Sequence, residues 1–143
     1  MLDKIAPPAP ENKITLEFAE LEFQRFAECM DLDVDTSYMD AEDLTAFNKQ
    51  KRKILNAICN GSLVINDNGE AIYTPRKSSI DAITFHERTG ASVMAMDGKK
   101  KNHNIAQTYA VMAEMTKTHP STFAKMRGID IKVCEAIFSL LMD

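Results

Sequence analysis

The chain has 143 residues, of which 45% are hydrophobic and 27% charged, and its formal net charge is −4. This length suits one domain whose core needs no disulfide or metal, and the composition excludes collagen-like and disordered proteins. No window approaches the roughly 18 apolar residues of a membrane helix, and the N-terminal residues lack the apolar run of a signal sequence. We therefore expect a protein that remains where it is made.

Charge is shared unevenly between the two halves. Residues 1–75 carry seven Lys or Arg against 14 Asp or Glu, and residues 76–143 carry ten against seven. Because the two halves have opposite net charge, the acidic half of one copy would attract the basic half of another, and salt would screen the attraction. Ordinary solvated faces are the alternative interpretation.

The first 12 residues hold three of the five prolines, which predicts a flexible Pro-rich arm. A single α+β domain is expected over residues 13–143, with an acidic N-terminal half (13–79) and a helical C-terminal half (80–143). Apolar and polar residues alternate over 14–18, which predicts a strand. A helix from about residue 15 is the alternative, and residues 21–30 have helical spacing in either case.

The acidic segment 31–42 matches part of an EF-hand calcium loop, with Asp31, Asp33, Asp35 and Glu42 at ligand positions. Thr36 stands where the loop needs glycine, and no second loop is present to pair with it. An acidic connection between two helices is the preferred interpretation, in which Asp40 caps the second helix.

That second helix is predicted over residues 40–60, because its apolar residues recur at three-and-four spacing and Asn60-Gly61 provides a left-handed cap. A basic cluster within it lacks interleaved aromatic residues, so we expect no nucleic-acid partner.

Two β-branched runs over residues 62–74 flank Asn68-Gly69, the preferred pair for a two-residue hairpin turn. Such a turn would place Ile65 opposite Ile72 and Val64 opposite Tyr73. A two-stranded hairpin is marginal alone, so a third strand is expected within residues 80–85.

Residues 80–97 change hydrophobic period partway, from this strand to a short helix with Val93 and Met94, and are interpreted as a hinge between the halves. Further helices are predicted over 105–117, from Pro120, and after Gly128, where Asp130 is the expected cap. The predicted fold is α+β: a small antiparallel β-sheet, made of a strand and a hairpin, packed with four to six α-helices.

No constellation of catalytic residues is present in the sequence. His86, His103 and His119 have no partner at metal-ligand spacing, and no serine lies in a GxSxG motif. The odd number of cysteines, Cys29, Cys59 and Cys134, favours reduced, buried thiols in a cytoplasmic protein. We expect no enzyme, cofactor or metal.

Six of the nine methionines lie after residue 90, on or beside predicted amphipathic helices. Flexible, polarizable side chains of this kind suit an adaptable surface for a hydrophobic partner, and core filling is the alternative.

The second half has a fixed order of features: a strand with a TFHERTG turn, a short helix ending MAMD, a basic break, the helix IAQTYAVMAEMT, a Pro-initiated helix and a Gly-x-Asp final helix with IFSLLMD. Over residues 80–142 this order resembles the tail assembly chaperones of long-tailed bacteriophages. The resemblance implies a self-associating, non-enzymatic protein of the host bacterial cytoplasm that coats the tape measure protein, or another long helical phage protein, before tail tube polymerisation.

The candidate contacts with a partner or a second copy lie on the matching helices and are Met94, Met112, Met115, Phe138 and Leu141. Two alternatives remain open at this point. The first is a structural or adaptor protein retained in the particle, and the weaker second is a calcium-binding module that uses the acidic segment.

Overall fold

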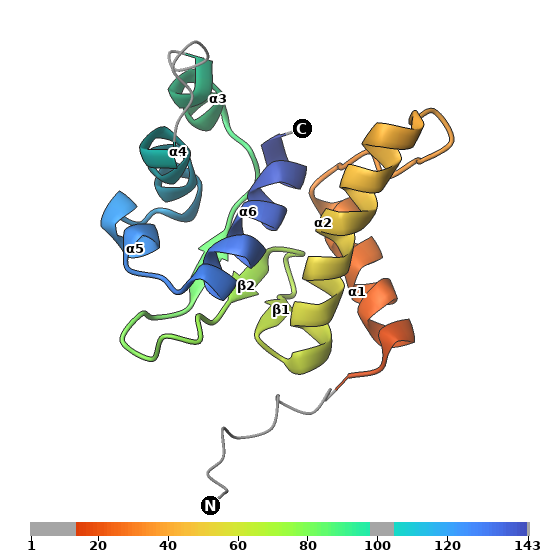
Figure 1. Cartoon of the computed structure of the whole chain (residues 1–143), viewed down its shortest axis with the longest axis horizontal. Coiled ribbons are helices and arrows are strands. Elements are labelled where there is room, and N and C mark those ends of the chain that lie inside the picture. Colours follow the sequence, from red (N-terminus) through yellow and green to blue (C-terminus); the bar gives the residue numbers. More distant parts are fainter. Residues whose placement is uncertain (1–13, 98–104, 143) are drawn as a thin grey trace, which may run out of the picture.

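The computed structural model describes residues 14–97 and 105–142, over which six helices pack with a three-stranded antiparallel sheet (Figure 1). The elements in chain order are α1 (Leu16–Cys29), α2 (Ala41–Asn60), β1 (Leu63–Ile65), β2 (Ala71–Tyr73), β3 (Ile83–Phe85), α3 (Gly90–Asp97), α4 (Ile105–Thr116), α5 (Pro120–Ala124) and α6 (Gly128–Met142). The predicted α+β class and helical C-terminal half are confirmed. The predicted Pro-rich arm, basic break and His103 lie outside the described residues.

The strand predicted over residues 14–18 is wrong, because α1 begins at Leu16. The Thr15 hydroxyl accepts a hydrogen bond from the Phe18 amide (3.2 Å), which satisfies one of the free donors of the first turn. This cap and the longer helical spacing outweigh an alternation of only five residues. The buried residues of α1 are Ala19, Phe23, Phe26 and Ala27.

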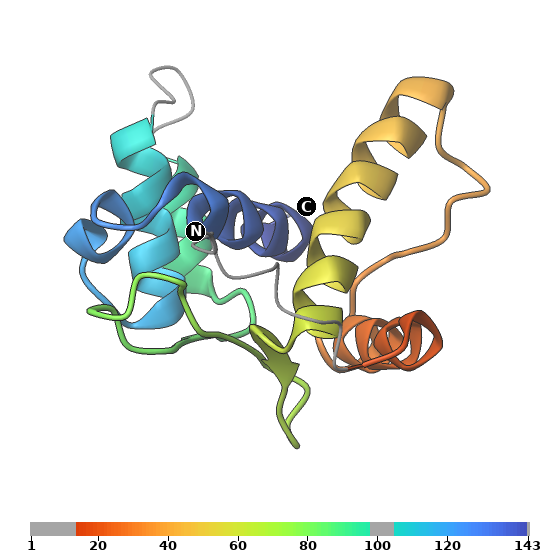
Figure 2. The ribbon, with the colours of Figure 1, turned by 60° about the horizontal axis from the view of Figure 1, so that its bottom comes forward.

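The helix predicted over residues 40–60 is confirmed as α2. Asp40 caps it by accepting a hydrogen bond from the Asp43 amide (2.8 Å), and Gly61 ends it with φ of 87°. Figure 2 shows the N-terminal end of α2 standing away from the other helices, with the connection from α1 running along its outer side. Its C-terminal half supplies the core residues Ile54, Leu55, Ala57, Ile58 and Cys59.

The predicted hairpin forms, but its register differs by one residue. Ile65 pairs with Ala71 and Val64 pairs with Ile72, so neither the expected Ile65–Ile72 pair nor the Val64–Tyr73 pair exists. A shift of one residue decides which side chains share a face. The buried face of the sheet consists of Leu63, Ile65, Ala71, Tyr73, Ile83 and Phe85.

The loop of the hairpin explains the shift. The Asn66 amide donates to the Glu70 carbonyl (2.9 Å) and the Gly69 amide donates to the Asn66 carbonyl (3.0 Å), so the loop holds residues 67–69. The Asn66 side chain also accepts hydrogen bonds from the amides of Asn68 and Glu70, both at 2.9 Å. Gly69 has φ of 81°, as expected for a turn followed by one left-handed residue.

The third predicted strand is confirmed as β3, which pairs with β2. Asp130, in contrast, does not cap α6, which already begins at Gly128. The fully buried Asp130 carboxylate accepts hydrogen bonds from the Tyr73 hydroxyl (2.6 Å) and the Arg76 amide (2.8 Å), with the Lys77 amide at 3.4 Å. It therefore joins the first turn of α6 to the chain that leaves β2.

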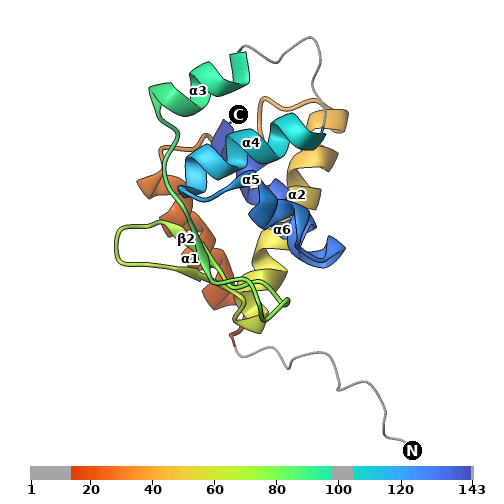
Figure 3. The ribbon, with the colours of Figure 1, turned by 90° about the vertical axis from the view of Figure 1, so that its left-hand side faces the viewer.

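One buried cluster contains residues from all three strands and from every helix of the described chain except α3. Figure 3 shows α3 on the outer side of α4. The start of α3 is fixed by a reciprocal pair of hydrogen bonds, because the Thr89 hydroxyl accepts from the Ser92 amide (3.3 Å) and the Ser92 hydroxyl accepts from the Thr89 amide (2.9 Å). Local capping therefore holds α3, while its described apolar side chains remain outside the core.

Candidate partner-binding surfaces

Four of the five side chains predicted to contact a partner are core residues. Met112, Met115, Phe138 and Leu141 are all buried, with Phe138 only 7% exposed. The apolar sides of α4 and α6 face β3, α5 and α2, so a partner has no access to these residues in this fold. The prediction is therefore corrected for these four. Met94 is 76% exposed and remains a candidate.

Exposed apolar side chains gather on the two helices at the outer end of the second half. Val93 and Met94 on α3 are 43% and 76% exposed, and Ile105 in the first turn of α4 is 66% exposed. The two helices pack on each other. We call Val93, Met94 and Ile105 the α3–α4 surface. Single exposed hydrophobic residues are common, but three large ones on two helices in contact are candidates for covering by a partner helix.

A second set of exposed apolar side chains lies on α1, where Leu16, Phe18 and Leu21 point away from the core. Sequence reasoning missed this set because residues 14–18 were assigned to a strand. The helical alternative contained the signal, since Phe18 and Leu21 are three residues apart and therefore share a face.

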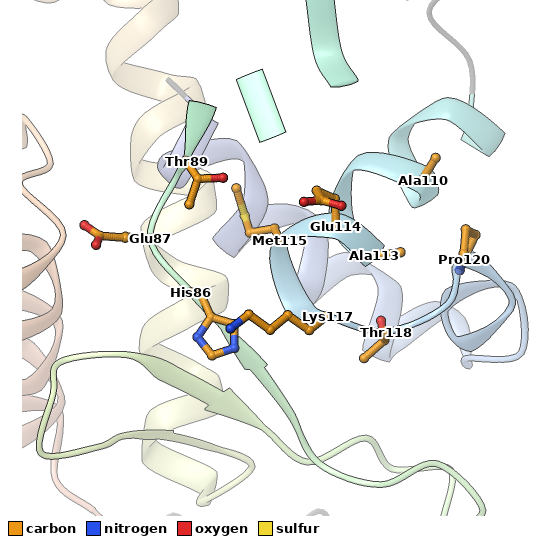
Figure 4. Close-up of a pocket in the computed structure, with 10 residues that line it drawn as sticks. All are labelled: His86, Glu87, Thr89, Ala110, Ala113, Glu114, Met115, Lys117, Thr118 and Pro120. Carbon is orange, nitrogen blue, oxygen red and sulfur yellow. The ribbon is translucent and has the colours of Figure 1, made fainter. Parts of the chain in front are cut away.

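An open pocket of about 360 Å³ lies between the end of β3 and the end of α4 (Figure 4). Figure 4 shows His86, Lys117 and Glu114 among the side chains that border the pocket. The hydroxyl groups of the two threonines that line the pocket form hydrogen bonds with neighbouring hydroxyl groups, Thr89 with Ser92 and Thr118 with Thr116.

The pocket is tied to the hairpin loop through His86. Its Nδ1 atom lies 2.7 Å from a carboxylate oxygen of Glu70. The pKa of Glu70 is held below its ordinary value, first because the Asn66 amide group donates to it (3.1 Å) and then because of His86. The lining residues include no Ser or Cys, and the hydrogen bonds described above for the two threonines do not involve His86.

Two carboxylates of the acidic segment, those of Asp33 and Asp35, bond within its own turns. Asp33 accepts a hydrogen bond from the Asp35 amide (3.0 Å), and Asp35 accepts from both the amide (2.9 Å) and the hydroxyl (2.6 Å) of Ser37. The Ser37 hydroxyl and then its amide hold the pKa of Asp35 below its ordinary value. Glu42 lies in the first turn of α2. Across residues 14–97 and 105–142, no group of three His, Cys, Asp or Glu side chains is placed to hold a metal ion.

The prediction of buried thiols is correct for Cys59 and Cys134 and wrong for Cys29, which ends α1 and is exposed. Burial, and then the charge of Asp130, raises the pKa of Cys134. The thiol of Cys134 therefore remains protonated and serves as a small core residue.

In the part of the chain that the structure describes, none of the helices has the length and apolar character needed to span a membrane.

No model of a known protein family, no curated protein and no solved structure matches the chain. The resemblance to tail assembly chaperones over residues 80–142 therefore stays a prediction.

Proposed function

We propose that the chain is a tail assembly chaperone of a long-tailed bacteriophage. It binds the tape measure protein, or another long helical phage protein, and keeps it soluble in the host bacterial cytoplasm until the tail tube polymerises. It acts by protein–protein contacts and self-association, without catalysis, nucleic acid or membrane.

The observation that supports this proposal is the α3–α4 surface. Its described apolar side chains are not needed by the core, yet Met94 is 76% exposed. A helical client presents apolar side chains at three-and-four spacing, and an unbranched Met side chain adapts to different versions of such a stripe.

The size of the surface sets the strength of binding. Complete burial of one Met side chain contributes about 1.5–3 kcal/mol, so three partly exposed side chains give weak binding to a single site. A long client with repeated stripes offers many such sites, and chains that also associate with each other bind it together. When the tail tube polymerises, the client is released as contacts with the tube replace each weak contact with the chaperone.

The test is the binding of the purified chain to the tape measure protein encoded by the same phage. We expect Met94→Asp to weaken binding about tenfold or more without altering the melting temperature, because the side chain is exposed. Leu21→Asp is the matched control, since it introduces the same charge at an exposed apolar site on α1. Equal losses in both variants, or none in either, would contradict a role for the α3–α4 surface.

The retained structural or adaptor protein remains the alternative, and purified phage particles distinguish the two. A chaperone leaves before the tail is complete, so mature particles should lack the chain. Its presence in a fixed number of copies would favour the alternative.

A further inference from the structure

A basic pocket of about 310 Å³ lies where the C-terminal half of α2, the chain leaving β2 and the first turns of α6 meet. We call it the basic pocket. Its cations are Lys53, Arg76 and Lys132, and its apolar wall includes Ile129 and Val133. This volume is at the lower end of the range of ligand pockets and suits one aromatic side chain with its neighbours.

Within the described residues, the cations of the basic pocket have no acidic partner. No residue that lines it is acidic, and no described residue forms an ion pair with Lys53, Arg76 or Lys132. The nearby carboxylate of Asp130 is fully buried and its hydrogen bonds go to Tyr73 and to backbone amides. The pocket therefore presents a net positive charge to whatever approaches it.

The complementary feature is the connection between α1 and α2. Residues 31–43 contain six Asp or Glu and no Lys or Arg, and we call them the acidic loop. The Met39 amide donates to the Thr36 carbonyl (3.1 Å), which closes a turn with Tyr38 at its tip, 91% exposed. An aromatic ring held out by a turn in an acidic segment has the form of an interface anchor.

Tyr38, near the end of the acidic loop, and the basic pocket lie at opposite ends of α2. The acidic loop ends at the N-terminus of α2, which Asp40 caps, whereas Lys53 and Asn60 in the basic pocket are 13 and 20 residues further along. At the rise of an α-helix this separation is about 20–30 Å, so Tyr38 of one chain cannot enter its own pocket. Figure 1 shows the start of α2 and the start of α6 in different parts of the molecule.

We propose that the acidic loop of one copy docks into the basic pocket of a second copy, with Tyr38 inserted against Ile129 and Val133 and the carboxylates paired with Lys53, Arg76 and Lys132. The inference rests on the self-association included in the proposed function and assigns its two surfaces. This docking does not involve the α3–α4 surface. Client binding is therefore measured separately, and a failure of docking between copies does not refute client binding, or the reverse.

Such docking joins two different surfaces and leaves a free loop at one end and a free pocket at the other. The chains therefore associate head to tail and continue beyond a dimer as concentration rises. Because the paired charges lie at the protein surface, association weakens as salt increases.

The first experiment measures the mass of the full-length protein by analytical ultracentrifugation, over a range of concentrations at low salt. We expect Tyr38→Ala and Lys132→Glu each to weaken association by about 30-fold or more, the loss typical of an interface anchor. Both residues are exposed, so the melting temperature should not change. Lys49→Glu is the matched control, because this side chain is exposed and does not line the basic pocket. Wild-type protein that stays monomeric, or assemblies that neither variant weakens, would overturn the proposal.

The second experiment mixes the two variants in equal amounts. Tyr38→Ala retains an intact pocket and Lys132→Glu retains an intact loop, so the mixture forms one interface and stops at a dimer of the two variants. A mixture that remains as monomeric as each variant alone, or one that forms longer chains, contradicts head-to-tail docking of this loop into this pocket.

Discussion

The buried carboxylate of Asp130 gives the most direct test of what joins the two halves of the fold. It lies in the first turn of α6 and accepts a hydrogen bond from the Tyr73 hydroxyl of β2 at 2.6 Å and from the Arg76 amide at 2.8 Å. The contact with the Lys77 amide, at 3.4 Å, is too long to contribute much. We predict that Asp130→Ala strongly destabilises the protein.

The magnitude follows from the two short bonds. A hydrogen bond to a charged group contributes about 1.5–3 kcal/mol, and the substitution also leaves the Tyr73 hydroxyl buried without its acceptor. We therefore expect Asp130→Ala to lower the free energy of unfolding by about 3–6 kcal/mol. Tyr73→Phe removes only one of the bonds and should cost about 1.5–3 kcal/mol.

The measurement is chemical denaturation followed by circular dichroism, with Asp81→Ala as an exposed control that should change stability by less than about 0.5 kcal/mol. The double variant with Tyr73→Phe and Asp130→Ala should lose less than the sum of the two single losses, because both remove the same bond. A loss below about 1 kcal/mol for Asp130→Ala, or simple additivity, would refute the idea that this carboxylate joins α6 to the sheet.

Three further predictions concern the core and the hairpin. Phe138→Ala should lower the free energy of unfolding by about 3–5 kcal/mol, because the ring is only 7% exposed, and a loss near zero in denaturation would place it outside the core. Burial, and then the bond to Asp130, raises the pKa of Tyr73 above its ordinary 10.0. Above pH 10 the unfolded chain therefore releases a proton that the folded chain keeps, so stability falls with rising pH by up to about 1.4 kcal/mol per unit, and Tyr73→Phe should reduce this slope in melts at alkaline pH. Gly69→Ala should cost at least about 1–2 kcal/mol, because φ is 81° and the added methyl would meet Cys29; a neutral result in the same assay would contradict the hairpin geometry.

Elements with complete local signals could be predicted from the sequence. The cap at Asp40, the three-and-four spacing and the terminal Gly61 together determined α2, and β3 followed from the need of a hairpin for a third strand. The hairpin register could not be predicted from Asn68-Gly69 alone, because the side chain of Asn66 bonds two amides of the loop and lengthens it by one residue. The role of Asp130 depends on Tyr73, which is 57 residues away in sequence, and no local pattern contains that contact.

The candidate surfaces show a second limit on what can be predicted from the sequence. Hydrophobic spacing identifies the apolar side of a helix, but it does not tell whether that side meets the core or a partner. Met94 and Met112 had equal standing in the sequence, and only the packing of α4 against β3 and α5 separates the buried side chain from the exposed one. Tyr38 lies in a segment that the sequence indicates only as an acidic connection, and its exposure at the tip of a turn depends on the fold.

We propose that this chain keeps a long helical client soluble, and this proposal can be tested directly. The most direct measurement is co-expression of the tape measure protein of the same phage with the wild-type chain, with the Met94→Asp variant, or alone, followed by the soluble fraction of the client. The account predicts a soluble client with the wild-type chain and an aggregated client in its absence, with Met94→Asp between the two. A client that is equally soluble, or equally aggregated, in all three cultures would contradict it.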